Sequence, residues 1–462
     1  MKKTIGTAVP LSALWSDKNK EKHGNLDTAL LFLDWLHATG QTAWQLLPLH
    51  ETQLVPGSKK DHVPSPYKGY GVGLDPSYLS PPLKRKKPSK QEISSFVAKQ
   101  NKWLPNHALF CALRDHFGTD NWTQWEADIR KRDKKAITTW RAKLKKQIDA
   151  YILEQWQLHH GFQRLRDKAR KYNIQLIGDL SFYIPLQSSL VWQFQNLFQL
   201  SENGEMKKVS GLPDGPKAHF GRQIWGHPLY NWKDTSCLDD ILTLWKRRLD
   251  YTSQLFDIVR LDHAKGFFSY GSMHRTDPKL DTIEKGPGVK VLKKIITYSR
   301  KIGLELFAED SGDRLKELRD ILHSSNVPGI RVLRFAYNEK RKKITKRYAN
   351  MSKYPIGTFA QSTTHDTETL LGYLNLLSLA EKKLLSKHCK IQFDADNIIL
   401  AIRLREALIL SPAHTVIIPI QDWLITTNRI NIPGTEKKVG DTNWQYRVSV
   451  SIENLPPVSI NP

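Results

Sequence analysis

Short apolar stretches recur along the chain, and longer stretches with helical periodicity separate them. In the helical stretches apolar residues return at three- and four-residue spacing, whereas the short ones are β-rich and bounded by turn residues. Eight short stretches stand out: residues 4–14, 42–49, 174–184, 256–262, 304–310, 327–337, 357–366 and 414–422. Such alternation favours parallel strands joined by helical crossovers, and eight repeats predict a (β/α)8 TIM barrel.

Two stretches interrupt this alternation. Residues 52–160 are too long for a loop and have their own helical periodicity, broken at Gly118, with Asp120 or Asn121 as a possible cap. Residues 200–235 are rich in glycine, proline and aromatic residues, which is typical of a loop over a barrel's active site. We therefore expect residues 1–462 to form a single catalytic barrel with an inserted, mainly helical subdomain at 52–160 and an inserted active-site loop region at 200–235.

The composition narrows the class of protein. No apolar run among the 462 residues is as long as a bilayer span, so we expect no membrane association. At the N-terminus, Pro10 interrupts the apolar run, which favours a first strand over a secretory signal. Cys111, Cys237 and Cys389 are far apart, which indicates neither a disulfide framework nor a metal-ligand spacing and predicts a cytoplasmic location.

The net charge of +24 raises nucleic acid or another polyanion as a partner. The basic residues form scattered runs, such as KRKKPSK from Lys84, which are typical of solvated surfaces. No nucleic-acid-binding motif accompanies them. We therefore expect no specific nucleic-acid partner.

Carboxylates gather where the predicted strands end. Asp179, Asp262, Glu309 and Asp366 all lie near the C-terminal end of a candidate strand. A lone aspartate there is more often a helix cap, but four on one face of a barrel indicate a reactive site.

Several carboxylates without a phosphate-binding glycine loop or a serine-histidine pair are typical of glycoside cleavage. One carboxylate attacks the anomeric carbon while a carboxylic acid protonates the leaving oxygen. Arg260 precedes Asp262 by two positions and so lies on the same side of its strand, where its charge should keep Asp262 ionised. A divalent metal held by these acids, His263 and His365 is the competing interpretation, but no short ligand spacing supports it. We expect neither a metal nor an organic cofactor.

The chain also resembles a known family through many motifs in order. They are TAWQLLPL, SPYKGYGVGLDPSYL, IGDLSFYIPLQSSLVW, QIWGHPLYNW, DIVRLDHAKGFF, LFAEDSG, VPGIRVLRFAY, TTHDTET, VIIPIQDWL, RINIPGT and NWQYRV. These motifs resemble those of the 4-α-glucanotransferases called amylomaltase or disproportionating enzyme, a branch of the α-amylase clan. The resemblance covers nearly the whole chain.

The resemblance implies a retaining transfer of an α-1,4-glucan segment to the 4-hydroxyl of an acceptor sugar. Asp262 matches the nucleophile, Glu309 the acid/base, and Asp366 the acid that stabilises the distorted sugar. Retention predicts that the carboxyl groups of Asp262 and Glu309 lie about 5 to 5.5 Å apart, and an acid role predicts a raised pKa for Glu309.

The resemblance also assigns supporting residues. Arg260 and His365 match residues around the donor glucose, Asp179 and Tyr67 match glucan-contacting residues, and Trp225 and Asn431 fall in loops that resemble the glucan-binding rim. It implies glucan and maltooligosaccharide substrates, no cofactor and no C-terminal β-sandwich domain.

Some positions depart from the family pattern. PDGPKAHF at 213–220 replaces a family loop, and Gln187 and Leu190 stand where the family has acids, which affects acceptor choice or loop closure. Two alternatives stay open: an α-glucan hydrolase with the same carboxylates, or a catalytically weakened basic protein that binds glucan or another polyanion. The sequence does not indicate donor length, formation of cyclic glucans or oligomeric state.

Overall fold

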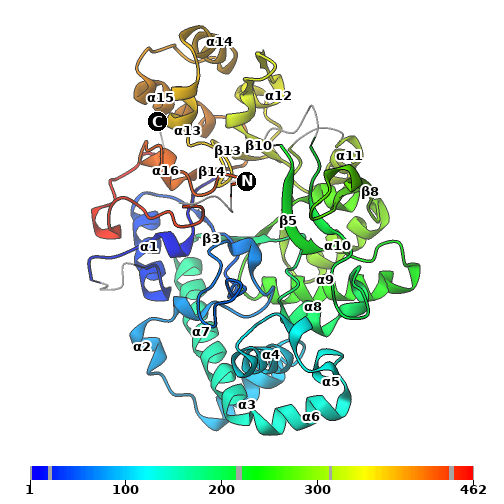
Figure 1. Ribbon diagram of the computed structural model, residues 1–462. Helices are drawn as coiled ribbons and strands as arrows, with labels where there is room; N and C mark the ends of the chain where they lie inside the picture. The colour runs from blue at the N-terminus through cyan, green and yellow to red at the C-terminus, as the bar shows by residue number, and fades with distance from the viewer. Residues whose placement is uncertain (1–2, 19–22, 215–220, 312–314, 436–441, 461–462) are drawn as a thin grey trace.

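The computed structural model describes residues 3–18, 23–214, 221–311, 315–435 and 442–460 (Figure 1). Its main sheet has eight parallel strands in the order β10-β13-β14-β1-β2-β3-β6-β9. The strands are β1 (Thr4–Ala8), β2 (Ala43–Gln45), β3 (Gln175–Leu180), β6 (Ile258–Leu261), β9 (Glu305–Ala308), β10 (Ile330–Val332), β13 (Phe359–Gln361) and β14 (Thr415–Pro419). Each lies within one of the eight predicted stretches, and the predicted (β/α)8 barrel is confirmed.

The two edges of this sheet meet and close it into a barrel. The backbone N–H of Ala308, in β9, donates to the carbonyl oxygen of Pro328 at 2.9 Å, and Ala308 forms a parallel bridge with Gly329 just before β10. Closure leaves no free strand edge, and it directs the C-terminal ends of all eight strands to one face.

Side chains inside the barrel change from apolar to polar along the strands. An apolar group packs in the interior: Ala43, Ile177, Ile258, Ile330, Val332, Phe307, Phe359 and Ile417. Because strand residues alternate with period two, the next inward positions are Gln45, Asp179, Arg260, Glu309 and Gln361. The Gln361 amide donates to the Gln45 side-chain oxygen at 2.7 Å within this polar layer. The strand sequences themselves therefore place a layer of polar side chains next to the apolar layer inside the barrel.

Helices cover the outside of the barrel and fill the crossovers (Figure 1). They are α1 (Leu26–Ala38), α7 (Lys145–Lys171), α8 (Ser189–Gln193), α9 (Leu238–Ser253), α10 (Val289–Lys301), α11 (Lys316–Ser324), α12 (Lys346–Ala349), α13 (Leu370–Leu376), α14 (Leu379–Cys389), α15 (Asn397–Ile409) and α16 (Ile420–Trp423). Their apolar faces pack against the outer sides of the strands in two large buried clusters. Within the described ranges, no helix combines the length and apolar character needed to cross a bilayer.

The helices within residues 52–160 gather at one end of the molecule, opposite α12 to α15 (Figure 1). They are α2 (Pro81–Lys84), α3 (Lys90–Lys99), α4 (Leu104–Phe117), α5 (Ala127–Arg130) and α6 (Lys134–Lys143), followed by the first part of α7. Helix α4 ends at Gly118, whose φ of 69° is the left-handed conformation that glycine favours. Asp120 caps no helix, because it instead accepts the Leu54 N–H at 2.6 Å and the Tyr70 hydroxyl at 3.1 Å. Since α7 runs unbroken past residue 160, the subdomain boundary there stays a proposal.

A second, four-stranded antiparallel sheet lies beside the barrel. It contains β4 (Val209–Leu212), β5 (Gln223–Pro228), β7 (Ser269–Met273) and β8 (Thr282–Lys285) in the order β5-β4-β7-β8. Strands β4 and β5 lie within 200–235, which the sequence predicts as loop. They escaped prediction because the glycine-rich segment lacks period-two alternation, and because β4 pairs with the distant β7. A short hairpin of β11 (Tyr337–Asn338) and β12 (Lys343–Ile344) completes the strands.

Candidate active site

Arg260 lies at the centre of the polar layer and contacts three carboxylates. It is paired in register with Asp179 on the neighbouring strand β3. One terminal nitrogen donates to Asp179 at 2.7 Å and to Asp262 at 2.8 Å, and the other donates to Glu309 at 2.5 Å. One buried guanidinium therefore binds a carboxylate of β3 and the carboxylates that directly follow β6 and β9.

Strand register places Asp262 beside Glu309. Leu261, the last residue of β6, is paired with Ala308, the last residue of β9, so the two acids are the next positions in line. The ladder continues one step, because the Glu309 N–H donates to the Leu261 carbonyl oxygen at 3.2 Å. The neighbouring side chains point into the same barrel mouth because both follow inward residues by two positions.

His263 turns the chain immediately after Asp262. Its backbone has φ 44° and ψ 41°, a left-handed conformation that is uncommon for residues other than glycine. In this conformation its N–H donates to a side-chain oxygen of Glu309 at 3.1 Å, the oxygen that Arg260 also binds. Local backbone strain at His263 is thus associated with the positioning of Glu309.

A second hydrogen-bonded chain joins Asp366 to this centre. The Tyr67 hydroxyl donates to Asp179 at 2.9 Å and lies 3.0 Å from Nε2 of His365. That nitrogen lies 3.2 Å from one carboxylate oxygen of Asp366, and the Asn431 amide donates to the other at 2.6 Å. Asp366 is therefore fixed on both sides.

The protonation of Asp262 and Glu309 differs from the expectation. Burial, with the charges of Asp179 and Glu309, raises the pKa of Asp262 to about 7 despite Arg260. Burial also acts to raise the pKa of Glu309, but Arg260, His263 and the His263 N–H outweigh it and hold that pKa below the usual value. In the free protein the raised pKa predicted for Glu309 is thus wrong, and Asp262 is fully ionised only above a pH of about 7. The reason is that Arg260 is shared among three acids while Glu309 receives an additional backbone donor.

Around Asp366, charged and hydrogen-bonded neighbours outweigh the effect of burial on the pKa. Burial would raise the pKa of Asp366, but His365 and Asn431 hold it at about 2. Burial likewise lowers the pKa of His365, but Asp366 raises it by more, to above its usual value. Asp366 is therefore held as a carboxylate, and its charge favours the protonated form of His365.

Aromatic side chains line the site. Trp225 lies on β5, and its ring meets that of His263 edge-on with centroids 4.8 Å apart. The Lys68 ammonium donates to the Trp225 carbonyl oxygen and so links β5 to the segment that carries Tyr67. Such rings present flat apolar faces of the kind that sugar rings stack upon.

All nine predicted site residues lie in one connected region, although their roles remain expectations. Trp444 and Arg429 are additional members that were not predicted. The Trp444 ring lies 5.6 Å from that of Tyr67 and 5.7 Å from that of His365, and Arg429 donates to the Asp366 carbonyl oxygen at 3.0 Å. Arg429 begins the RINIPGT motif, and Trp444 lies in the NWQYRV motif. No residue spacing in either motif indicates a role in the site.

The departures from the family pattern have different places in the structure. Leu190, where the family has an acid, is buried in α8, whereas Gln187 precedes that helix and is partly exposed. Residues 215–220 of the altered loop lie outside the described residues. Within the described part of the chain, one group of three possible metal ligands is found, Glu51, His107 and Cys111, and none of them belongs to this network.

A closed (β/α)8 barrel with linked carboxylates at its C-terminal face has the parts that an enzyme of glycoside cleavage or transfer needs. Comparison with known sequences specifies the family. A profile described as 4-alpha-glucanotransferase matches residues 9–83 and 77–452, so the chain belongs to the 4-alpha-glucanotransferase family.

Individual relatives agree with this assignment. The chloroplastic/amyloplastic 4-alpha-glucanotransferase of Arabidopsis thaliana is 28% identical over 472 residues, covering 93% of this chain and 79% of the relative. The 4-alpha-glucanotransferase of Aquifex aeolicus is 28% identical over 458 residues, covering 91% and 90%. An amylomaltase structure from Streptococcus agalactiae, in complex with acarbose, superposes with a TM-score of 0.82 at 22% identity, covering 97% of this chain and 95% of that one. The fold is thus shared, and the chain is a glucan-transferring enzyme.

Proposed function

We propose that Asp262 is the nucleophile and Glu309 the acid/base of a retaining α-1,4-glucan transfer, with Asp366 stabilising the distorted sugar. The observation that carries the assignment is the Arg260 guanidinium, which binds Asp262 and Glu309 at the same time. Both acids therefore lie close together in the barrel mouth, which supports their joint action on one glycosidic bond. Maltooligosaccharides and α-1,4-glucans are the proposed substrates, as the names of the relatives suggest.

In the first half of the reaction, a carboxylate oxygen of Asp262 forms a bond to the anomeric carbon. The bond from that carbon to the leaving oxygen breaks, and Glu309 gives its proton to that oxygen. In the second half, Glu309 takes the proton of an acceptor 4-hydroxyl, whose oxygen replaces Asp262 on the anomeric carbon. Two inversions give net retention.

The starting proton must therefore lie on Glu309. In the free protein, burial raises the pKa of Asp262, whereas Arg260 and the His263 N–H lower that of Glu309, which favours the proton on Asp262. Both arrangements contain the same single proton, because the two acids share Arg260 and are coupled. We propose that glucan binding moves this proton to Glu309, so that none has to enter from solvent.

Other residues serve this pair without reacting. Arg260 and His365 would hold the acids, Asp179 and Tyr67 would contact the donor sugar, and Trp225 would stack on the glucan. Asn431 would fix Asp366 through the 2.6 Å hydrogen bond. The proposed location is the cytoplasm, which the three free, buried cysteines support.

The test is to incubate the purified protein with maltotriose and measure the products, free glucose and total reducing ends. Transfer produces glucose and a ladder of longer maltooligosaccharides at constant reducing ends. Asp262→Asn should abolish the ladder. A matched control is Asp257→Asn, because Asp257 precedes the same strand at its other end and pairs with Arg166 at 2.9 Å.

Rising reducing ends without a ladder would instead indicate a hydrolase. No reaction with maltotriose, maltose and soluble starch would contradict the proposed activity. If Asp262→Asn formed the longer maltooligosaccharides as fast as the wild type does, the assignment of the nucleophile would be contradicted.

A further inference from the structure

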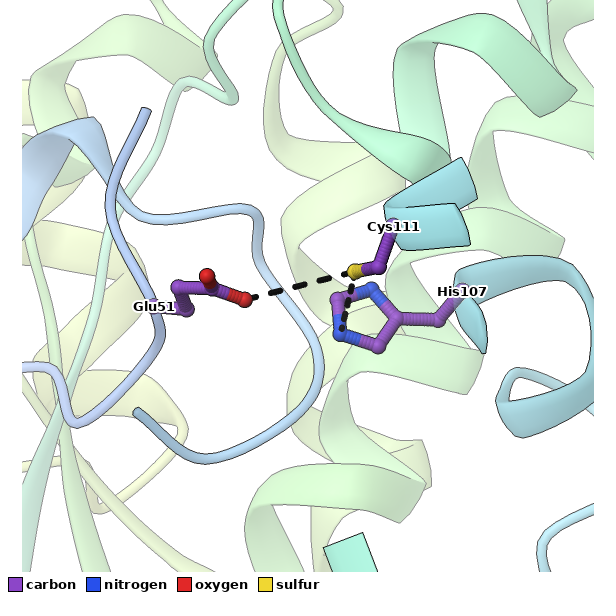
Figure 2. Close-up of side chains that lie close together, drawn as sticks. All are labelled: Glu51, His107 and Cys111. Atoms are coloured by element: carbon purple, nitrogen blue, oxygen red, sulfur yellow. Dashed lines mark hydrogen bonds between the residues drawn. The ribbon is translucent and has the colours of Figure 1, made fainter. Parts of the chain in front are cut away.

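Three potential metal ligands converge away from the catalytic network (Figure 2). His107 and Cys111 project from α4 with a spacing of four residues, which places them on one face of the helix. Glu51 approaches them from the segment that follows β2. All three side chains are buried, and their ligand atoms lie within 4.8 Å of one another.

The two distances from the Cys111 sulfur suit a tetrahedral zinc ion after a small contraction. Sγ of Cys111 lies 3.7 Å from Nε2 of His107 and 4.0 Å from a carboxylate oxygen of Glu51. Ordinary Zn–S, Zn–N and Zn–O bond lengths at tetrahedral angles put such pairs about 3.6 Å apart. The first distance is close to this value already, and the second needs a movement of about 0.4 Å.

The three possible ligand atoms make only long contacts with one another. The other polar atoms of His107 and Glu51 form ordinary hydrogen bonds. Nδ1 of His107 lies 3.1 Å from the Ser189 hydroxyl, so an N–H there would leave Nε2 as the lone-pair donor. The other Glu51 oxygen accepts from Arg114 at 2.6 Å, which directs the remaining oxygen toward Cys111. Between the three groups there are only long sulfur contacts.

The charges of the cluster can also accommodate a dication. On binding, the Cys111 thiol would release its proton to solvent, so a thiolate and a carboxylate would face the ion. The thiolate and the carboxylate together offset the charge of the dication. Only the positive charge of Arg114 then remains in the buried group. Zinc accepts each of these donor types, one sulfur, one nitrogen and one oxygen, and a water molecule would be the fourth ligand.

We propose that Glu51, His107 and Cys111 form a zinc-binding site. The site would fasten the segment that carries Tyr67 to α4, because Glu51 also accepts the Tyr70 N–H through its carbonyl oxygen at 2.9 Å. Zinc would then stabilise the fold and hold one wall of the active site without taking part in the reaction.

The test uses the full chain without a histidine tag, produced in zinc-supplemented medium and dialysed against metal-free buffer. Elemental analysis should find about one zinc per chain. Cys111→Ser and His107→Gln should each weaken zinc affinity by at least about tenfold, measured by chelator competition, since loss of a hydrogen-bonding group behind a ligand alone costs about 10–100-fold. Cys389→Ser is the matched control, because Cys389 is also buried and free but lies outside the cluster.

Protein produced with cobalt in place of zinc gives an independent readout. A thiolate-to-cobalt charge-transfer band should appear in the wild type and in Cys389→Ser, and should be absent in Cys111→Ser. Glu51→Gln, which keeps the size of the side chain, provides a further variant if Cys111→Ser fails to fold. Its cobalt spectrum should change while its circular dichroism stays that of the wild type.

Metal-free wild type after growth in zinc and in cobalt would overturn the proposal. Equal metal content in the wild type, Cys111→Ser and Glu51→Gln would overturn it as well. Since the readouts are metal content and spectra, they are independent of the maltotriose assay and of the proposed reaction.

Discussion

The carboxylates of Asp262 and Glu309 bind the two terminal nitrogens of one guanidinium, at 2.8 and 2.5 Å from Arg260. Because Asp179 shares that same cation, three acids compete for one fixed positive charge. Burial makes a fully ionised group costly, so Asp262 retains a proton up to a pH of about 7. The proposed catalytic pair therefore keeps one proton up to a pH of about 7 in the free protein.

This pair predicts the pH dependence of kcat/KM for maltotriose. Above a pH of about 7 the last proton leaves the pair, so no acid remains to protonate the leaving oxygen and the rate falls. The acidic limb should lie below the usual range of a glutamate, where the pair gains a second proton. Initial rates at low substrate across pH 3 to 10 measure both limbs, and a flat profile between pH 6 and 9 would contradict the shared proton.

Asp179→Asn should move the alkaline limb to lower pH, on the order of one unit, because a negative charge that raises the pKa of Asp262 is removed. The change also leaves Arg260 fewer carboxylates to bind, which acts in the same direction. The measured quantity is the position of the limb, which a simple loss of sugar binding would not shift. Movement toward higher pH would show that Asp179 does not act on Asp262 in this way.

Asp262→Asn should stabilise the protein at neutral and alkaline pH. The folded-state pKa of about 7 exceeds the usual unfolded value, so the wild type loses stability as the pH rises from about 4 to 7. That loss amounts to at most about 4 kcal/mol, and the variant avoids it. Urea unfolding at pH 8 and at pH 4 should show a gain that nearly vanishes at pH 4.

Asp366→Asn is the matched control for this effect, since its sign is reversed. The folded-state pKa of Asp366 lies at about 2, below the unfolded value, so its charge stabilises the fold above a pH of about 4. That stabilisation disappears as the pH falls toward 2. Asp366→Asn should therefore destabilise the protein at neutral pH, and two variants that shift in the same direction would contradict the assigned pKa values.

Asn431→Ala should lower kcat for transfer by about 10- to 100-fold, which is the usual worth of a hydrogen bond to a charged group. The Asn431 amide is the donor that fixes one oxygen of Asp366 at 2.6 Å, and its loss should also raise the pKa of Asp366. Steady-state kinetics with maltotriose separates this loss in kcat from a change in KM. Asn375→Ala, on an exposed part of α13, should leave both parameters unchanged, and an unaffected kcat in Asn431→Ala would exclude a positioning role.

Phe307→Ala should destabilise the barrel by about 3 to 5 kcal/mol, because it leaves a cavity in a packed interior. Phe307 is fully buried, and its ring stacks on that of Phe359 with centroids 3.8 Å apart. Denaturant unfolding of the variant measures the loss. Phe393→Ala, at a partly exposed position, should lower the free energy of unfolding much less. An equal loss in both variants would show that the stacking of Phe307 on Phe359 adds no stability of its own.

The sequence by itself determined the eight barrel strands and the acids at their ends. Period-two burial, turn residues and the position of a polar residue after an apolar run are local properties, so they can be recognised without the fold. Asp179, Arg260, Asp262 and Glu309 follow directly from this alternation. The family motifs assigned glucan-binding roles to Tyr67, Trp225 and Asn431.

Only the tertiary structure decided how these groups act on one another. The contact of Tyr67 with His365, the pairing of β4 with β7, and the packing of Trp444 join segments far apart in sequence. The location of the shared proton also depends on burial and on which acids reach Arg260. These quantities depend on distance and desolvation in three dimensions, to which neighbouring residues in the chain give no guide.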